Sequence, residues 1–452
     1  MHQTTTARPR TGAELELTVD SLAYGGAGVA RHNSYVVFVD GAVPGDRVRA
    51  HLYKTRRSYG NARAVEILEP GPDRVERVAD HPGAPWQILA YERQLEAKQL
   101  QVEEALRRIG SLEGFALEPI VPAVEQWRYR NKVEFSFGGG HGDLLCGFHV
   151  PGRWDEIVDV PDTLLASAAI NAVRERLVGW CRGQRLAPYD RRTGDGFLRN
   201  LVVREGRRTG DLQARLVTCP GDLDREGLAR AAGDLTGVLW TRTSALAEVS
   251  QGGETEIVAG SEWIEEELGG MRFRVSPEAF FQTNTEMAER LYETAVQYAQ
   301  PGGFERVYDL YCGIGSIGLL MAPRAGEVWG LELVEGAVRD AIANARSNEV
   351  DNARFLAGDI RLTLRGLLEQ AGAPDVLVVD PPRAGLSQKV VRRIVEATPR
   401  RIVYVSCNPT TLAPNAAQLV QAGYALERVR PVDVFPQTPH IECVALLQRS
   451  SR

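Results

Sequence analysis

From about residue 275 onward, apolar strand-like segments alternate with amphipathic helical ones, and this pattern constrains the fold more than any other feature of the chain. Strands that are apolar along their whole length, with helices between them, predict a parallel sheet covered on both faces. In such sheets ligands sit beyond the carboxyl ends of the strands, so we expect the chemistry directly after each strand. The alternating segments are 284–299, 306–310, 316–322, 327–332, 336–348, 376–380, 387–396, 401–406, 411–421 and 442–447.

The rest of the chain divides into three further parts. Residues 11–70 hold five short strand-like runs separated by turns, which predicts an OB-like β-barrel, a common nucleic-acid platform. Residues 71–120 start as a Pro- and Gly-rich linker and continue as a helix over 91–110. Residues 121–274 predict an α+β central domain. With a Rossmann-like domain over 275–452, the expected class is α/β with an N-terminal barrel and an α+β central domain.

Cationic residues gather in the second half of the predicted barrel. Cations can meet phosphates, and tyrosine faces can stack on bases, so this stretch is a candidate RNA contact. A basic, solvated strand face explains the pattern equally well. The net charge of −6 does not indicate a nucleic-acid binder, although binding needs only a local patch. The cations, with no acid among them, are Arg47, Arg49, Lys54, Arg56, Arg57 and Arg63.

Several protein classes fit the composition poorly. No apolar run reaches the 18 residues typical of a membrane span, and residues 1–10 lack the apolar stretch of a signal peptide. The six cysteines are scattered, without a C-x-x-C pair, which is typical of a reducing compartment. We therefore expect a cytoplasmic protein without a membrane or metal site.

The loop that follows the first predicted strand of the α/β domain, residues 309–318, matches G-x-G-x-x-G, so a dinucleotide is one candidate ligand. Asp309 favours S-adenosylmethionine instead, because that ligand has no pyrophosphate and its amino and ribose groups need acceptors. Glu332, after the next strand, suits the ribose of either ligand, and Asp359, after the following strand, suits an adenine edge. A helix N-cap is the structural alternative for each acid.

The fourth and fifth strands end in residues suited to chemistry on a base. Two prolines follow Asp380 and fix its loop beside the cleft. Cys407 follows the fifth strand and is expected to face the cleft, and a thiolate is the nucleophile for a weak electrophile. Its addition to carbon 6 of uracil makes carbon 5 an enolate carbon that can take a methyl group. A base must then remove the proton from carbon 5.

That base is expected in the segment Thr438 to Glu442. Strand alternation predicts that His440 and Glu442 share one face of the last strand. We assign the base to Glu442 and a role in orienting the loop to His440, with His440 as the alternative base. The sequence does not identify the group that deprotonates Cys407.

Five motifs in this order resemble the RNA uridine-5-methyltransferase family, whose members modify 23S ribosomal RNA or the T-loop of transfer RNA. The similarity covers nearly the whole chain, since the barrel resembles the family's TRAM domain and YRNKVEFSF at 129–137 resembles its central domain. The motifs are FFQTN at 280–284, DLYCGIG at 309–315, DPPR at 380–383, SCNP at 406–409 and FPQTPHIE at 435–442.

The resemblance implies a set of site residues. Cys407 would be the nucleophile and Glu442 the base, in agreement with the reasoning from the residues, and Arg130 and Lys132 would lie near the RNA. Ser316 stands where many relatives have an asparagine, and we include it as a cofactor contact. The remaining residues implied to line the S-adenosylmethionine site are Gln282, Tyr311, Glu332, Asp359 and Asp380.

Many relatives hold a [4Fe–4S] cluster on four cysteines, and this chain lacks all four. The stretch Asp80 to Trp86 contains no cysteine, Ala84 stands at the last of three ligand positions, and the fourth falls near Thr163. Such clusters need thiolate ligands, so we expect no iron–sulfur cluster. We expect apolar packing around Trp86 and Tyr91 to hold this region instead.

The prediction is thus a monomeric methyltransferase that acts on RNA, with 23S rRNA favoured over tRNA by chain length and domain set. A nicotinamide-dependent oxidoreductase would explain the glycine-rich loop and Glu332 but not Cys407 and Glu442. A non-catalytic RNA-binding protein would explain the barrel but not that pair.

Overall fold

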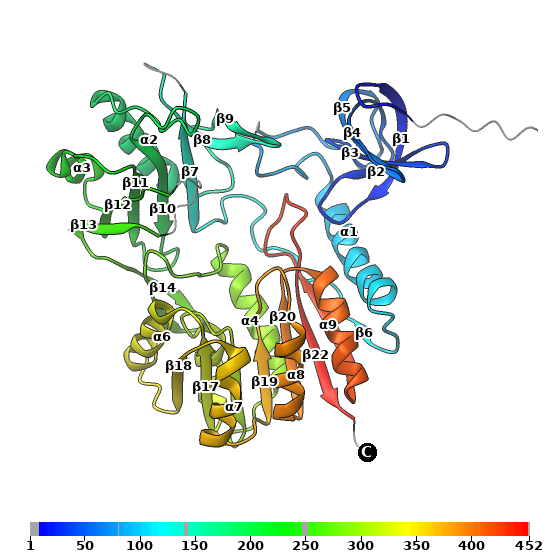
Figure 1. Ribbon diagram of the computed structural model, residues 1–452, viewed down its shortest axis with the longest axis vertical. Helices are drawn as coiled ribbons and strands as arrows, with labels where there is room; N and C mark the ends of the chain where they lie inside the picture. The colour runs from blue at the N-terminus through cyan, green and yellow to red at the C-terminus, as the bar shows by residue number, and fades with distance from the viewer. Residues whose placement is uncertain (1–8, 80, 140–142, 246–251, 451–452) are drawn as a thin grey trace, which may run out of the picture.

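The computed structural model describes residues 9–79, 81–139, 143–245 and 252–450. The structure has three parts: a barrel drawn in blue, a sheet drawn mainly in green, and a larger α/β part drawn in yellow to red (Figure 1). None of the helices in these ranges combines the length and hydropathy needed to span a bilayer. The predicted fold class is confirmed.

The N-terminal barrel is closed in the strand order β1-β2-β3-β5-β4. Alternate residues of each strand point inward, which is why Val37 and Val39 of β3 are both fully buried. Asp46, also buried, accepts hydrogen bonds from the backbone of Gly71 (2.8 Å) and from Arg74 (2.7 Å to Nη2) and so ties the barrel to the next segment. The strands are β1 (Glu14–Leu22), β2 (Gly28–His32), β3 (Tyr35–Asp40), β4 (Arg47–Thr55) and β5 (Tyr59–Glu69).

The central part is a seven-stranded sheet in the order β13-β12-β11-β10-β7-β8-β9. Helix α2 (Ala168–Gly183) packs on β10 and α3 (Arg225–Ala232), and together they enclose one apolar core. The strands are β7 (Lys132–Gly138), β8 (Leu145–Val150), β9 (Arg153–Asp159), β10 (Leu198–Glu205), β11 (Leu212–Thr218), β12 (Gly237–Arg242) and β13 (Glu254–Gly260).

A short hairpin follows, made of β14 (Ile264–Leu268) and β15 (Met271–Val275). It packs beside α6 (Glu335–Ser347), because the backbone N–H of Arg274 donates to Asn344 Oδ1 at 2.7 Å. The hairpin therefore joins the central sheet to the α/β part.

The C-terminal sheet has eight strands in the order β18-β17-β16-β19-β20-β22-β21-β6. Neighbours from β18 to β20 are parallel, and β22 runs antiparallel to β20. Its strands are β16 (Arg306–Leu310), β17 (Glu327–Glu332), β18 (Ala353–Ala357), β19 (Val376–Val379), β20 (Arg401–Ser406), β21 (Tyr424–Val432) and β22 (Glu442–Arg449), with β6 (Ala116–Leu117) at the edge.

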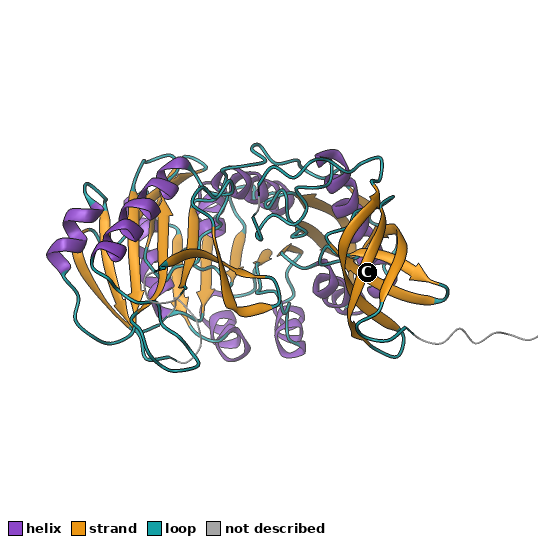
Figure 2. Cartoon of the chain, turned by 90° about the horizontal axis from the view of Figure 1, so that it is seen from above, coloured by secondary structure: helices purple, strands orange, loops and turns teal. Residues whose placement is uncertain are grey.

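Helices lie on both sides of these strands, as the view from above shows (Figure 2). Val376 and Val378 face one apolar cluster, whereas Leu377 and Val379 face the other. The wholly apolar strands of the sequence are explained by this double burial. The helices are α4 (Thr285–Ala299), α5 (Ser316–Met321), α6, α7 (Ile360–Ala371), α8 (Gln388–Ala397) and α9 (Pro409–Gln421), with the 3₁₀ turn Ala322–Arg324 after α5.

Helix α1 (Tyr91–Glu104), extended by a π-helical turn at Ala105–Ile109, packs against the loop 433–441 between β21 and β22. Lys98 Nζ lies 2.5 Å from Asp433 Oδ1, and both side chains are fully buried. The hydroxyl of Tyr91 donates to Asp433 Oδ2 (2.8 Å). Gln94 and Gln437 exchange two hydrogen bonds, at 2.9 and 3.0 Å.

These contacts correct, for Tyr91, the expectation that apolar packing around Trp86 and Tyr91 holds this region. Trp86 is buried, but Tyr91 is held by hydrogen bonds to a carboxylate. Where relatives would hold the cluster, His81 Nε2 is hydrogen-bonded to Thr163 Oγ1, and Ala84 packs on Leu165. Asp80 lies outside the described residues. Within the described ranges no group of three or more His, Cys, Asp or Glu side chains is arranged to hold a metal ion.

The buried Lys98–Asp433 pair gives a stability prediction. We expect Lys98→Ala to lower the midpoint of thermal unfolding by about 5–15 °C, because an uncompensated buried carboxylate costs roughly 3–5 kcal/mol. The control is Arg108→Ala, which removes an exposed helix pair with Glu104 and should change the midpoint little. Equal unfolding midpoints for the two variants would show that Lys98 does not compensate a buried charge on Asp433. The double variant Lys98→Met, Asp433→Leu should recover part of the loss.

Candidate active site

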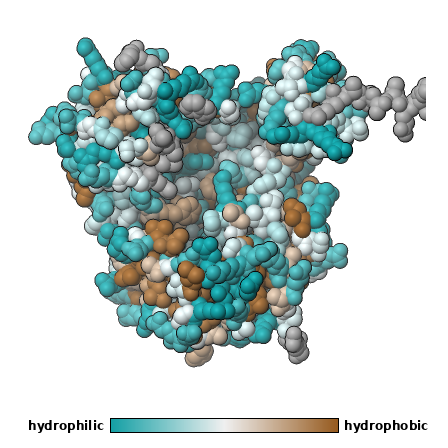
Figure 3. Space-filling model, viewed as in Figure 1, coloured by the Kyte–Doolittle hydropathy of each residue, from teal (hydrophilic) through white to brown (hydrophobic). Residues whose placement is uncertain are grey.

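The candidate active site lies at the carboxyl edge of the eight-stranded sheet. The loops after β16, β19 and β20 meet there because these strands are parallel neighbours. Since β22 is antiparallel to β20, its first residue lies at the same edge. The space-filling view shows the molecular surface hollowed where the barrel, the central sheet and the C-terminal part meet (Figure 3).

Cys407 and Glu442 come together through strand register. Ser406, the last residue of β20, pairs with Cys443 of β22. The next residue on one strand and the preceding residue on the other therefore lie side by side, and these are Cys407 and Glu442. Glu442 is 3% exposed, whereas Cys407 is partly exposed. A partly exposed thiol thus lies beside a buried carboxyl group.

Asn408 holds the cysteine loop in place. Its side-chain oxygen accepts a hydrogen bond from the backbone of Thr410 (3.0 Å) and caps α9, and Pro409 fits the first position of that helix. Its amide nitrogen donates to the carbonyl of Arg383 (3.1 Å). One side chain therefore fixes the cysteine loop against the loop that carries Asp380.

The electrostatics of this edge are dominated by acids. Burial raises the pKa of Asp309 and of Asp380 to about 7, and the charge of Asp380 contributes to the first of these shifts. The pKa of Glu442 is raised well above its usual range by burial and by Asp380, and Arg383 opposes this. The pKa of Cys407 is raised to about 11 by burial, then by Glu442 and Asp380, again with Arg383 opposing.

This charge pattern fits a cationic ligand better than an anionic one. Asp309 Oδ2 accepts the backbone N–H of Gly318 (2.9 Å), but its buried Oδ1 has no hydrogen-bond partner among the described residues. A sulfonium or ammonium group would favour the ionised carboxylates, whereas a pyrophosphate would be repelled by them. The site therefore fits S-adenosylmethionine and disfavours a dinucleotide.

The glycine-rich turn has room for such a ligand. Gly313 has a φ of +55°, and nothing lies within 4 Å of where a Cβ would be. Glu332 accepts hydrogen bonds from the backbone of Gly313 (3.2 Å) and Val334 (2.9 Å), which points its carboxylate at the turn. Tyr311 adopts φ +63°, a left-handed conformation that is uncommon outside glycine and here occurs at the edge of the candidate cofactor site.

The other expected cofactor residues are placed as follows. Ser316 is the first residue of α5, and Gln282 precedes α4; both side chains are buried. Asp359 caps α7 through the backbone of Arg361 (2.9 Å) and also pairs with the Arg361 side chain. Asp359 therefore has the helix-capping role that was the structural alternative for this acid. A contact to adenine would be made in addition to the cap.

The placement of His440 differs from the expectation. Strand β22 begins at Glu442, so His440 lies in the preceding loop and does not share a strand face with Glu442. Its ring meets Phe435 edge-on at 5.9 Å, and burial lowers its pKa to about 4, helped by Arg383 and Arg130. A neutral, packed imidazole of this kind suits the orienting role.

The candidate RNA contacts lie on two parts of the molecule. Arg56 and Arg57 are exposed in the β4–β5 turn, and neither is in an ion pair with another described residue. By contrast, Arg47 pairs with Glu69 (3.1 Å), so part of the basic stretch is already neutralised. Lys132 starts β7, and burial lowers its pKa to about 8.

Arg130, just before β7, lies beside the loop 433–441 that contains His440. Its charge lowers the pKa of His440 and of His81, which places it near both rings. Its Nε is buried without a hydrogen-bond partner in the described part of the chain. Of the two central-domain cations, Arg130 is therefore the one next to the candidate active site.

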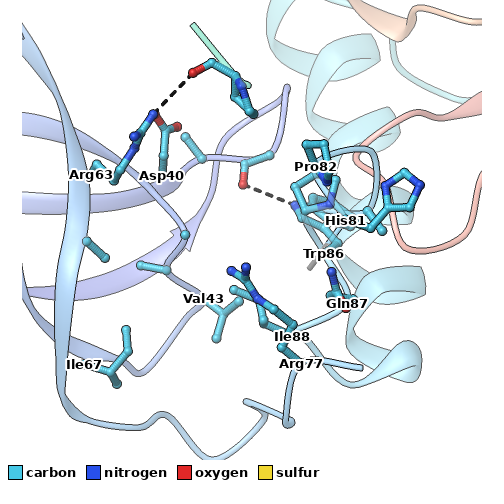
Figure 4. Close-up of a pocket in the computed structure, with 18 of the residues that line it drawn as sticks. Asp40, Val43, Arg63, Ile67, Arg77, His81, Pro82, Trp86, Gln87 and Ile88 are labelled. Carbon is cyan, nitrogen blue, oxygen red and sulfur yellow. Dashed lines mark hydrogen bonds between the residues drawn. The ribbon is translucent and has the colours of Figure 1, made fainter. Parts of the chain in front are cut away.

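A cavity of about 670 Å³ opens between the barrel, the segment 74–88 and the β8–β9 turn. Arg63 crosses it to the carbonyl of Pro151 (3.4 Å), and the indole of Trp86 donates to the carbonyl of Gly26 (3.2 Å) (Figure 4). These two hydrogen bonds attach the barrel to the β8–β9 turn and to Trp86.

Sequence reasoning missed Arg383, although it quoted the motif that contains it. This exposed cation lowers the pKa of Cys407 and of Glu442, and its backbone carbonyl anchors Asn408. An arginine after two prolines was a signal, but its proximity to the thiol follows only from the strand order.

We expect Arg383→Gln to slow alkylation of Cys407 by iodoacetamide at pH 8–9, because removing the cation raises the pKa of the thiol. A rise of half a unit would slow the reaction about threefold. In Arg383→Lys, Cys407 should be alkylated at the wild-type rate. Cys219, which is also partly exposed, serves as the internal reference in the mass spectrum. Wild-type alkylation in the Gln variant would show that Arg383 does not act on the thiol.

Comparison with known proteins identifies the family. The family described as tRNA (Uracil-5-)-methyltransferase matches residues 222–450, and the TRAM domain matches residues 8–65. RNA methyltransferases of Halalkalibacterium halodurans and Thermosynechococcus vestitus, both described as uncharacterized, are 35% and 37% identical to this chain. The first alignment covers 96% of both chains, and the second covers 97% of this chain and 99% of the relative.

Among solved structures, the Pyrococcus abyssi tRNA (uracil-54, C5)-methyltransferase in complex with S-adenosyl-L-homocysteine matches with a TM-score of 0.80 at 28% identity. The match covers 96% of this chain and 99% of that one. These findings overturn the alternatives of an oxidoreductase and of a non-catalytic RNA-binding protein. The chain belongs to the tRNA (uracil-5-)-methyltransferase family and is an S-adenosylmethionine-dependent RNA methyltransferase with an N-terminal TRAM domain.

Proposed function

We propose that the protein methylates carbon 5 of a uridine in RNA through a covalent bond from Cys407 to carbon 6, and that Glu442 removes the proton from carbon 5. The observation that carries the proposal is the register of β20 and β22, which brings the partly exposed thiol and the buried carboxyl group side by side.

The chemistry follows from these two groups. The Cys407 thiolate adds to carbon 6, and the electron pair of the 5,6 double bond moves into an enolate that makes carbon 5 nucleophilic. S-adenosylmethionine supplies the methyl group on a sulfonium. Carbon 5 then carries both a methyl group and a proton, and Glu442 takes that proton. The restored double bond expels the thiolate. The raised pKa of Glu442 makes its carboxylate a stronger base than that of an exposed glutamate.

The cofactor would lie along the carboxyl edge from β19 to β18. Asp380 and Asp309 favour its cationic groups, Glu332 faces the glycine turn, and Asp359 lies at the next strand end. Tyr311, Ser316 and Gln282 complete the proposed lining.

The RNA would contact cations on both sides of the site. We propose Arg56 and Arg57 on the barrel as phosphate contacts, since both are exposed and without ion pairs to described residues. Arg130, beside His440, would contact the RNA strand that enters the active site, and Lys132, at the start of β7, is the second RNA contact that we propose in the central domain.

Two RNA targets are candidates. The sequence led us to favour 23S rRNA because of chain length and domain set. The Pyrococcus abyssi enzyme, which is named for uridine 54 of tRNA, matches this chain over 99% of its length. The domain set therefore does not distinguish the two RNAs. The T-loop of tRNA is the second candidate, and the similarity to the Pyrococcus abyssi enzyme supports it.

The target can be mapped directly. RNA from a strain without the gene should lack one 5-methyluridine, and incubation with purified protein and S-adenosylmethionine should restore it at the same position. Mass spectrometry of separated 23S rRNA and tRNA reports which RNA gains the methyl group. Unchanged 5-methyluridine in every RNA fraction of the deletion strain would contradict the proposal.

We expect Glu442→Gln to accumulate a protein–RNA adduct that survives denaturing electrophoresis. Attack and methyl transfer do not need the base, whereas elimination does. Cys407→Ala is the matched control: it should form no adduct and no product, while S-adenosylmethionine still binds, because the cofactor acids lie on other loops. Product release by Glu442→Gln at the wild-type rate would exclude Glu442 as the base.

A further inference from the structure

The turn between β1 and β2 of the barrel reaches the loop 433–441 that precedes Glu442. The backbone N–H of Gly26 donates to the carbonyl of Ala23 (3.0 Å) and closes the turn. The carbonyl of Ala23 accepts a hydrogen bond from Gln101 of α1 (3.2 Å), and that of Gly26 accepts one from the Trp86 indole (3.2 Å). Both flanks of Tyr24 are thus fixed to the scaffold around the site.

Gly26 allows an unusually close approach. A Cβ at this position would lie 2.9 Å from both Pro439 Cβ and Trp86 Nε1, and φ is +99°. The turn therefore packs directly on the loop 433–441, at a residue three positions before Glu442. A larger residue at 26 would push the turn away from the site.

Tyr24 projects from this turn and is 45% exposed. Burial of its other side raises the pKa of the phenol, and Cys407, Arg383 and Glu442 are among its electrostatic neighbours. The barrel thus presents a neutral aromatic ring beside the nucleophile and the proposed base.

We propose that Tyr24 is an RNA-binding residue whose ring stacks on the nucleobase adjacent to the target uridine while that uridine occupies the site at Cys407. The inference rests on the proposed function. A uridine that reaches a thiol at a sheet edge must leave its stack, and its neighbour then loses a stacking partner. An aromatic ring at the rim replaces that partner for any base, because every base has a π-face.

This assignment gives the barrel a second role. Arg56 and Arg57 would hold phosphates at the β4–β5 turn, whereas Tyr24 would act at the reacting nucleotide itself. Because the turn is attached to α1 and Trp86, the ring is held in position before RNA arrives, so little ordering is needed on binding.

The test measures methyl transfer to a short transcript that contains the uridine mapped above. We expect Tyr24→Ala to lower kcat/KM about five- to a hundredfold, the range for loss of one base–aromatic stack. Tyr24→Phe should stay within about twofold, because the ring remains. The matched control is Phe304→Ala, which removes a 94% exposed aromatic just before β16, at the opposite edge of the sheet, and should leave kcat/KM unchanged.

A second measurement separates stacking from a merely structural effect. Abasic substitution of each nucleotide flanking the uridine should, on one side, lower wild-type kcat/KM by a similar factor. On that transcript Tyr24→Ala should have no further effect, since the partner is already gone. S-adenosylmethionine affinity and the unfolding midpoint should match wild type.

Three outcomes would overturn the proposal: wild-type kcat/KM in Tyr24→Ala, additive losses on both abasic transcripts, or an equal defect in Tyr24→Phe. The last would assign the effect to the hydroxyl instead of the ring. Failure of the proposed function is recognised separately, because the wild-type protein would then make no 5-methyluridine in the transcript.

Discussion

The buried contact between Lys98 and Asp433 is the interaction on which the arrangement of the active site depends. Asp433 begins the loop that leads from β21 to Glu442, and its carboxylate is held from α1 by an ammonium and a phenol. Two buried ionisable groups are expensive to desolvate, so this pair adds little to net stability compared with apolar residues. It does select one position of the loop, because any other would leave a charge unpaired.

Other parts of the molecule also hold the loop 433–441 in this position. Tyr129 donates to the carbonyl of Pro436, Asn284 to that of Val434, and Gly26 of the barrel packs on Pro439. The loop is thus shared by the barrel, α1, the central domain and α4. A loop held in this way fixes the start of β22, and with it the position of Glu442, although the loop itself has little regular structure.

Much of the α/β fold follows from the sequence, because whole-length apolar strands have few ways to be buried. The strand ends also located Cys407, Asp380 and Glu332, since ligand sites in such sheets follow the strands. Lys98 and Gln94 carried no such signal: each is a polar residue on a helix, and its burial depends on a partner more than three hundred residues away. His440 was misplaced because period-two patterning cannot show where a strand begins.

The edge of the sheet carries a consequence for biosynthesis. Strand β6 pairs in parallel with β21, and Val121, shortly after β6, forms a further bridge to Val432. Residues near position 120 therefore form the edge of a sheet whose other strands all come after position 300. On the ribosome this segment emerges about three hundred residues before its partner, and α1 emerges well before the loop 433–441 on which it packs. The strands of the barrel and of the seven-stranded sheet all precede residue 261, whereas the eight-stranded sheet is complete only when β22 has been made. Until the last strands are made, the loop 433–441 is absent, and Lys98 and Gln94 of α1 lack the hydrogen-bond partners that they have in the folded protein.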